Sequence, residues 1–224
     1  MKITSLKVNM LLNAVKGLMN ILFPLITFPY VSNILGVNEL GRYNFAVSII
    51  NYFILFAGLG INAYAVREAT EYRGDKKKFN KFADQIFTIN LMTSGMSYLF
   101  LMAFIICIPR FQNSFWLLLI LSLQIIFRTI GVDWIYTIYE EYLYITVRSI
   151  VFQIISLVLL FLLVKTKDDI HYYALTTVMS AAGSNVMNFV HSQKICRFHL
   201  TMKIDWGRHI KPILVLFAMS VTIT

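Results

Sequence analysis

Two basic side chains lie inside long apolar runs of the sequence, where an unpaired charge is costly. Lys16 interrupts the run from Leu11 to Leu35, and Arg128 lies within the run from Phe115 to Ile135. In a membrane protein such side chains face the bundle interior or water, because facing lipid costs on the order of 3 kcal/mol. Lys16 and Arg128 are therefore candidate cations of a hydrated cavity. For Arg128 a structural ion pair is the open alternative.

Uncharged polar residues form stripes along five of the apolar runs. In the first run Asn13, Lys16 and Asn20 follow one another at spacings of three and four, which keeps them on one face of a helix. The uncharged cavity candidates taken from the stripes are Asn13, Asn20, Asn51, Asn62, Gln124 and Gln153. A single stripe is typical of helix packing in membranes. Five stripes that include a lysine and an arginine favour a shared hydrated cavity.

Asp133 follows Arg128 by five residues, which is about 140° around a continuous helix at 3.6 residues per turn. The two side chains are therefore not expected to form a same-face pair. Asp133 and Trp134 lie near the end of their run, where interfacial charges and aromatic rings are common. We expect Asp133 to form a structural ion pair there with Arg148 or with a basic loop.

The composition places the helices that carry these residues in a membrane. Hydrophobic residues make up 58% of the 224-residue chain, charged residues 14%, and the mean hydropathy is +0.69; soluble domains have roughly 45 to 50% apolar residues. Runs of about 20 apolar residues are long enough to cross the hydrocarbon core. The sequence thus predicts an all-α, polytopic membrane helix bundle with six complete transmembrane helices, over residues 11–35, 45–66, 82–108, 115–135, 147–164 and 173–190.

The chain is expected to form one six-helix lobe over residues 1–212, with the beginning of a seventh helix over 213–224. From Ile213 to Thr224 the sequence is apolar but too short to span, so we expect a truncated helix. The segments outside the runs are too short for a second domain with its own core. Cys107 and Cys196 fall on opposite sides of the predicted bundle and cannot pair. No spacing of ligand residues indicates a metal site or a cofactor.

The net charge of +9 follows the loops and does not indicate nucleic acid. Basic residues gather before the first run, between Arg67 and Lys81, and between Lys194 and Lys211. The alternate loops hold only Arg42, Arg110, Lys165 and Lys167. Because Lys and Arg are enriched in cytoplasmic loops, the N-terminus is predicted to be cytoplasmic. The basic loops are expected to touch anionic membrane lipids.

Three segments together resemble a known family. They are "FPLITFPYVSNILGVNELGRYNFAVSI", "GLGINAYAVREA" and "DWIYTIYEEYLYITVRSI". Gly36 and Gly41 flank the first predicted outer turn, and the run from Asp133 to Tyr144 joins the fourth and fifth helices. In this combination the chain is similar to the Wzx-type flippases of polysaccharide repeat units, in the superfamily that includes lipid II flippases and multidrug exporters. The resemblance covers all 224 residues.

The resemblance implies a bacterial cytoplasmic-membrane transporter, without catalysis, built from two six-helix lobes around a central cavity. This chain would be the N-terminal lobe, and without the other lobe it is not expected to flip substrate. The implied substrate is an undecaprenyl-pyrophosphate-linked oligosaccharide. Lys16 and Arg128, with Arg42 and Arg148 near the cavity mouths, would bind pyrophosphate, and the Asn and Gln residues would bind sugar hydroxyls. Other membrane proteins of polysaccharide assembly are further candidate partners.

Three alternatives remain open from the sequence. A multidrug exporter of the same superfamily would be expected to carry acidic residues at mid-membrane, where this chain has Lys16 and Arg128. A membrane-embedded polysaccharide polymerase or transferase would be expected to show a large outer loop or a paired His/Asp site. The four histidines, His171, His191, His199 and His209, are instead expected at interfaces or in loops. The third alternative is a non-functional truncated remnant.

Overall fold

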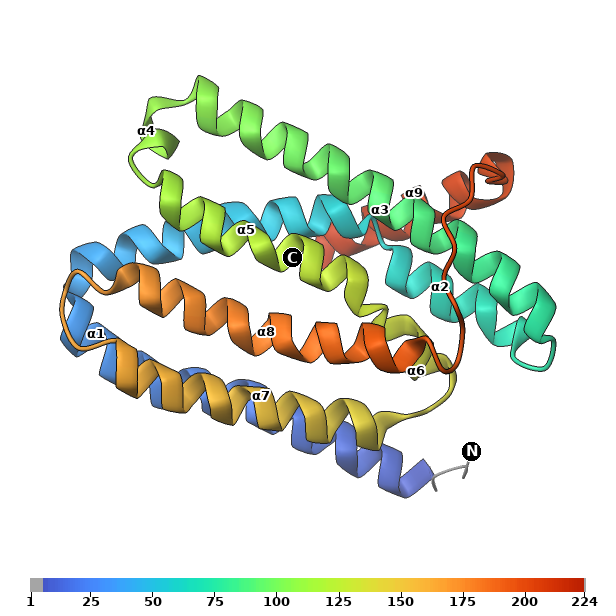
Figure 1. The fold of residues 1–224 in the computed structure, drawn as a ribbon, viewed down its shortest axis with the longest axis horizontal. Coiled ribbons are helices and arrows are strands. Elements are labelled where there is room, and N and C mark those ends of the chain that lie inside the picture. The colour runs from blue at the N-terminus through green and yellow to red at the C-terminus, as the bar shows by residue number, and fades with distance from the viewer. Residues whose placement is uncertain (1–5, 224) are drawn as a thin grey trace.

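The computed structural model describes residues 6–223 and shows a bundle of long, roughly antiparallel helices (Figure 1). No strand occurs among these residues. Three segments are long and apolar enough to cross a membrane, Met10–Tyr72, Lys76–Cys107 and Tyr142–Leu163, and Phe115–Gly131 is a shorter apolar helix. The predicted all-α membrane helix bundle is thus confirmed. The number of complete spans stays a prediction.

Helix α1 (Leu6–Gly58) is a hairpin of two arms that turns at Gly36. Gly36 has φ 74° and ψ 173°, a backbone conformation that is essentially restricted to glycine. Pro24 and Pro29 lie inside the first arm. The second arm ends at Gly58 and continues after a break as α2 (Ile61–Ala69). The first turn is therefore at the predicted position, whereas the predicted second span, 45–66, is interrupted.

The next helices complete the middle of the bundle. A short 3₁₀ turn (Thr70–Tyr72) leads to α3 (Lys76–Cys107), followed by the one-turn α4 (Pro109–Gln112) and by α5 (Phe115–Gly131). Asp75 caps α3, because its carboxylate accepts hydrogen bonds from the backbone N–H groups of Lys77 and Lys78, both at 3.1 Å. These bonds and the charge of Lys78 hold the pKa of Asp75 below its ordinary value.

The fourth predicted span, 115–135, is wrong as a single helix. It breaks at Val132, which has φ 41° and ψ 42°, and α6 (Asp133–Ile138) begins at the next residue. The left-handed region is rare for a β-branched residue, and here tertiary packing imposes it, since Val132 is only 2% exposed. Gly131 permits a close approach of α8 at this point, because a Cβ there would lie 2.6 Å from Asn185 Oδ1.

The last helices are α7 (Tyr142–Leu163), α8 (Ile170–Ser192) and α9 (Trp206–Ile223). Helices α7 and α8 form a second hairpin, which packs beside the α1 hairpin (Figure 1). Four hydrogen bonds join the two hairpins, Leu12 with Thr146, Asn20 with Gln153, Tyr30 with Val164 and Tyr43 with Thr177. Their partners are 133 or 134 residues apart in every case. A constant separation means that corresponding arms of the two hairpins run in parallel.

Two apolar clusters form the core. The first contains Val31, Ile50, Leu101, Leu118 and Val178, and the second contains Ile61, Phe79, Trp134 and Ile213. Burying such side chains stabilises each by about 1.5 to 3 kcal/mol in water, and less within a bilayer, where packing dominates.

The bundle has two ends (Figure 1). At one end lie the start of α1, the α2–α3 connection, the α6–α7 connection and the link from α8 to α9. The Gly36 turn, α4 and the α7–α8 link lie at the other end. The arrangement places the basic segments of the sequence together at one end, as alternation of the spans requires. Cys107 and Cys196 are both free.

Candidate functional site

Arg128 lines a cavity in the middle of the bundle. This first cavity has a volume of about 290 Å³ and is bordered by α1, α2, α3, α5 and α9; its polar lining includes Arg128, Asn62, Asn90, Thr129 and Ser220. The Oδ1 atom of Asn90 is buried and has no hydrogen-bond partner among residues 6–223. Thr129 is held by Ile125 O and by the Ser94 hydroxyl at 2.5 Å. No ion pair joins Arg128 to another residue between 6 and 223.

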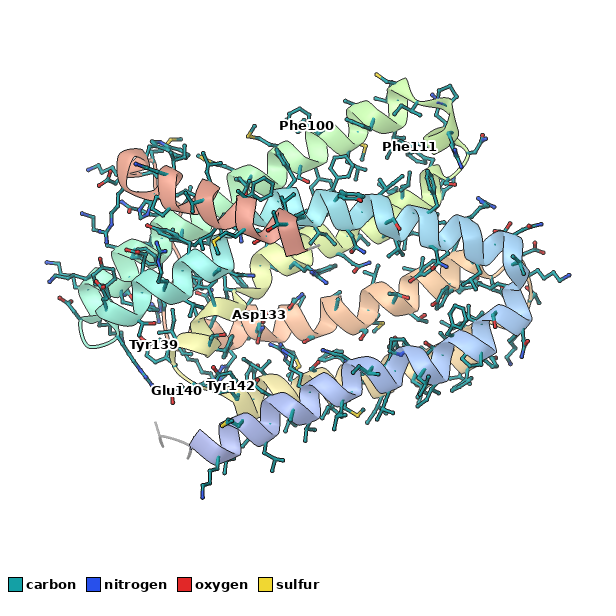
Figure 2. The ribbon with its side chains drawn as sticks, turned by 180° about the vertical axis from the view of Figure 1, so that it is seen from behind. Phe100, Phe111, Asp133, Tyr139, Glu140 and Tyr142 are labelled. Atoms are coloured by element: carbon teal, nitrogen blue, oxygen red, sulfur yellow. The ribbon has the colours of Figure 1, made fainter. Side chains whose placement is uncertain are left out.

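A second cavity of about 540 Å³ adjoins the first, since Asn62 and Ala63 line both. Asp133, Trp134 and Arg67 are also in its wall. Arg67 is balanced by Glu68 at 3.3 Å, whereas Asp133 leaves 52% of its side chain exposed. Asp133 lies further inside the bundle than Tyr139 and Glu140, which mark its end (Figure 2). The break at Val132 thus brings a carboxylate to the same polar space as Arg128.

Arg148 lies behind Asp133 and is almost completely buried. Its side chain is 5% exposed, and its Nη2 lies 3.7 Å from Asp133 Oδ1. The guanidinium also lies over the ring of Tyr144, 5.7 Å from the centroid. Asn188 donates a hydrogen bond to the same carboxylate oxygen. The expected ion pair of Asp133 with Arg148 is therefore confirmed, and Asp133 also lines the second cavity.

Part of the hydrogen-bonding capacity of the Arg148 guanidinium is unsatisfied within residues 6–223. Its Nε and Nη1 atoms are buried and have no hydrogen-bond partner in the described part of the chain. A buried N–H without a partner costs about 1 to 3 kcal/mol, and more when it is charged. The 3.7 Å separation from Asp133 is also longer than a hydrogen bond. Arg148 can therefore donate further hydrogen bonds to an anionic ligand through these N–H groups.

Three cations act on the carboxylate of Asp133. Asp133 is within electrostatic reach of Lys16, Arg128 and Arg148. Lys16 is half-buried on the first arm of α1, and its charge also interacts with that of Arg148. We call these four residues the charge cluster, and its net charge is +2. Arg128 and Asp133 thus share one electrostatic site, contrary to the expectation from a continuous helix.

The uncharged candidates divide between this region and the outer surface of the bundle. Asn20 accepts a hydrogen bond of 2.9 Å from Gln153 Nε2, which joins the α1 and α7 stripes. Asn62 lines both cavities, and Gln124 is half-buried one turn before Arg128. Asn13 and Asn51 are exposed and line neither cavity. Their role as sugar ligands stays a prediction.

Arg42 lies apart from the charge cluster. It pairs with Glu39 at 3.0 Å and donates to Asn113 O at 3.3 Å, next to Arg110, in a separate cavity of about 300 Å³ at the end of the bundle that holds α4. Its charge is largely balanced there. The structure therefore joins Arg148, but not Arg42, to Lys16 and Arg128.

The sequence missed Asn90 and Asn188. Asn90 belongs to a polar series in α3, Asp84, Gln85, Thr88, Asn90 and Ser94, which was a usable signal. Asn188 lies in the predicted span 173–190, but its hydrogen bond with Asp133 joins two helices and cannot be predicted from spacing along the chain. Between residues 6 and 223 no three His, Cys, Asp or Glu side chains are placed to hold a metal ion. His191 and His199 approach Glu141 and Asp84 at 3.9 and 3.8 Å.

Fold and site define the class as an all-α membrane protein that carries a cluster of basic residues around one carboxylate beside cavities in its helix bundle. The chain matches the family described as "Polysaccharide biosynthesis protein" over residues 6–224 and belongs to it. It is also similar to the "Putative O-antigen transporter" of Escherichia coli (strain K12), at 25% identity over 166 residues. That match covers 74% of this chain and 40% of the relative. No solved structure matches. The resemblance to polysaccharide flippases is thereby confirmed.

Proposed function

We propose that this chain forms one lobe of a flippase that moves undecaprenyl-pyrophosphate-linked oligosaccharide from the cytoplasmic to the outer leaflet of a bacterial cytoplasmic membrane. The observation that carries the proposal is the charge cluster, which has a net charge of +2 beside two cavities in an otherwise apolar bundle. Pyrophosphate has about two negative charges in such a lipid, and Arg and Lys are its usual ligands.

The mechanism follows from the separation of apolar and polar surfaces. The lipid tail would stay in the bilayer beside the exposed apolar faces of α1, α3 and α7, which carry Leu18, Leu99 and Val158 among others. The pyrophosphate and sugars would cross through the polar space by alternating access between two lobes. With the cell interior negative, outward movement of two negative charges is favoured by about 4 to 5 kcal/mol per 100 mV. Nothing in this scheme requires a catalytic residue.

The function is tested first at Arg128. In cells whose own gene is replaced by an Arg128→Ala variant, we expect export of surface polysaccharide to fall by about tenfold or more while membrane abundance stays near normal. The reason is that no carboxylate among residues 6–223 forms a direct ion pair with this arginine. Arg128→Lys should be intermediate, since lysine keeps the charge but loses the bidentate fork. Surface polysaccharide and protein abundance are measured in the same cells.

Lys16→Ala should reduce export in the same direction, because Lys16 belongs to the charge cluster. The matched control is Arg110→Ala, an exposed arginine stacked on Phe45 at the α4 end, 4.9 Å from the ring centroid. This variant should leave export unchanged. A protein that exports normally with Arg128→Ala would rule out the cluster as the pyrophosphate site. Loss of abundance equal to the loss of export would show a structural role instead.

A further inference from the structure

Asp133 and Arg148 form an unusual pair, because the arginine is buried and the carboxylate is exposed. Arg148 is 5% exposed and Asp133 52%. A buried ion pair repays its desolvation cost only when the geometry is close and further hydrogen bonds satisfy the remaining donors. Here the separation is 3.7 Å, and two nitrogens of the buried partner remain without any hydrogen bond between residues 6 and 223. The geometry leaves Arg148 ready for a better anionic partner.

Asp133 is also held so that it can move away from Arg148 without losing its other support. Asn188 donates to its carboxylate from α8, and the second cavity lies on its open side. Asp133 is the first residue of α6, directly after the left-handed Val132. A small rotation of the carboxylate toward the cavity would free the face of Arg148. The second cavity, which Asp133 lines, has a volume of about 540 Å³ and is large enough for a diphosphate.

We propose that Asp133 is a resident counter-ion of Arg148, which the pyrophosphate of the lipid-linked substrate displaces when it binds. The inference rests on the proposed function and gives Arg148 and Asp133 separate roles in it. Arg148 is then the inner pyrophosphate ligand, because once Asp133 leaves Nη2 this nitrogen forms a two-donor fork with the free Nε or Nη1. Lys16 and Arg128 supply further positive charge to the same carboxylate site. Asp133 lowers the affinity of the empty site and recaptures Arg148 as the substrate leaves. Such competition favours release, which a transporter needs as much as binding.

Binding of farnesyl pyrophosphate to the purified chain in lipid nanodiscs tests this inference, with farnesol as the uncharged reference. The Asp133→Asn variant should bind farnesyl pyrophosphate about tenfold more tightly, because it removes a negative charge next to the ligand and keeps an acceptor for Asn188. Arg148→Gln should bind it about tenfold more weakly. Neither variant should alter binding of farnesol.

The matched control is Glu39→Gln, which removes a carboxylate from an arginine pair at the opposite end of the bundle. It should leave the affinity unchanged. If Asp133→Asn does not accumulate, Asp133→Glu replaces it. Its longer side chain reaches closer to Arg148 and should weaken binding of the probe.

The outcomes separate the two proposals. A wild-type chain that binds farnesyl pyrophosphate no better than farnesol would overturn pyrophosphate recognition, and this inference with it. Preferential binding by the wild type, with unchanged or weaker binding by Asp133→Asn, would overturn the counter-ion role alone. The same conclusion would follow if Asp133→Glu bound the probe as tightly as the wild type or more tightly. Opposite effects of the Asp133→Asn and Arg148→Gln variants would support it.

Discussion

At the scale of single residues, His209 is buried in a network of hydrogen bonds between helices. It was expected in a loop or at an interface, yet its exposure is 0%. Gln85 donates to Lys203 O at 2.8 Å, so its oxygen is free to accept from His209 Nε2 at 2.7 Å. His209 Nδ1 then accepts from the Tyr64 hydroxyl at 2.8 Å. This chain of bonds fits the neutral imidazole and ties the start of α9 to α2 and α3.

The network predicts a pH dependence. Burial lowers the pKa of His209 below its ordinary value of 6.5, and Arg208 acts in the same direction, while Asp205 and Glu68 oppose it. As pH falls below 6.5 the unfolded chain binds a proton that the folded chain resists. The free energy of unfolding should therefore be highest above pH 6.5 and fall as the medium becomes more acid. Thermal unfolding between pH 7.5 and 5.5 measures it.

His209→Ala should lower the free energy of unfolding by about 1 to 3 kcal/mol at pH 7.5, because Tyr64 and Gln85 lose a buried partner. The substitution should also reduce the pH dependence of the free energy of unfolding. His171→Ala, a half-buried histidine of α8 at the other end of the bundle, is the control and should keep the wild-type profile. Identical profiles for wild type and His209→Ala would contradict the assignment.

The charge cluster shows which parts of a site can be predicted from residue types. Lys16 and Arg128 were identifiable because a charge in an apolar run is costly wherever it faces lipid. Arg148 was predicted as a mouth residue, and its burial depends on Asp133, Tyr144 and the packing of α6 on α7. Such contacts join residues from different helices. The periodicity of a single sequence describes the faces of each helix and does not reveal contacts between different helices.

At the scale of elements, the turn at Gly36 and the helix break at Val132 were not equally predictable from the sequence. The turn at Gly36 was predictable, because a glycine followed by polar residues interrupts an apolar pattern. The break at Val132 was not, since valine disfavours the left-handed region and the surrounding pattern continues as a helix. Packing of Gly131 against Asn185 and burial of Val132 outweigh the local preference there.

Gly36 and Gly41 provide a matched test of the turn in the α1 hairpin. A Cβ would meet nothing within 4 Å at either Gly36 or Gly41, so that only the backbone differs. Gly36→Ala should destabilise the protein by about 1 to 3 kcal/mol, because alanine is strained at this φ and ψ. Gly41→Ala, inside the second arm, should stabilise it by about 0.5 to 1 kcal/mol. Thermal unfolding in detergent compares them, and equal shifts would argue against a turn at Gly36.

At the scale of the whole molecule, the distribution of basic residues predicts its orientation. The structure places Lys77 and Lys203 at one end of the bundle and Asn38, Asn113 and Asp168 at the other (Figure 1), and all five are exposed. Enrichment of Lys and Arg indicates that the first end is cytoplasmic. In a Cys107→Ser background, a membrane-impermeant thiol reagent should label Asn113→Cys and Asp168→Cys in intact cells. Lys77→Cys should be labelled only after permeabilisation, and labelling from outside would reverse the topology.

The constant separation of 133 or 134 residues between bonded partners also fixes the delay between the synthesis of the first hairpin and that of the second. At about 5 to 20 residues per second, the first arm of α1 leaves the ribosome roughly 7 to 27 s before its α7 partners. During that interval Lys16 and Asn20 have entered the membrane region, but Gln153, Arg148 and Asp133 either do not exist or are not yet in place. The newborn protein therefore carries Lys16 and Asn20 in the membrane region without these later partners for longer than most small domains take to fold.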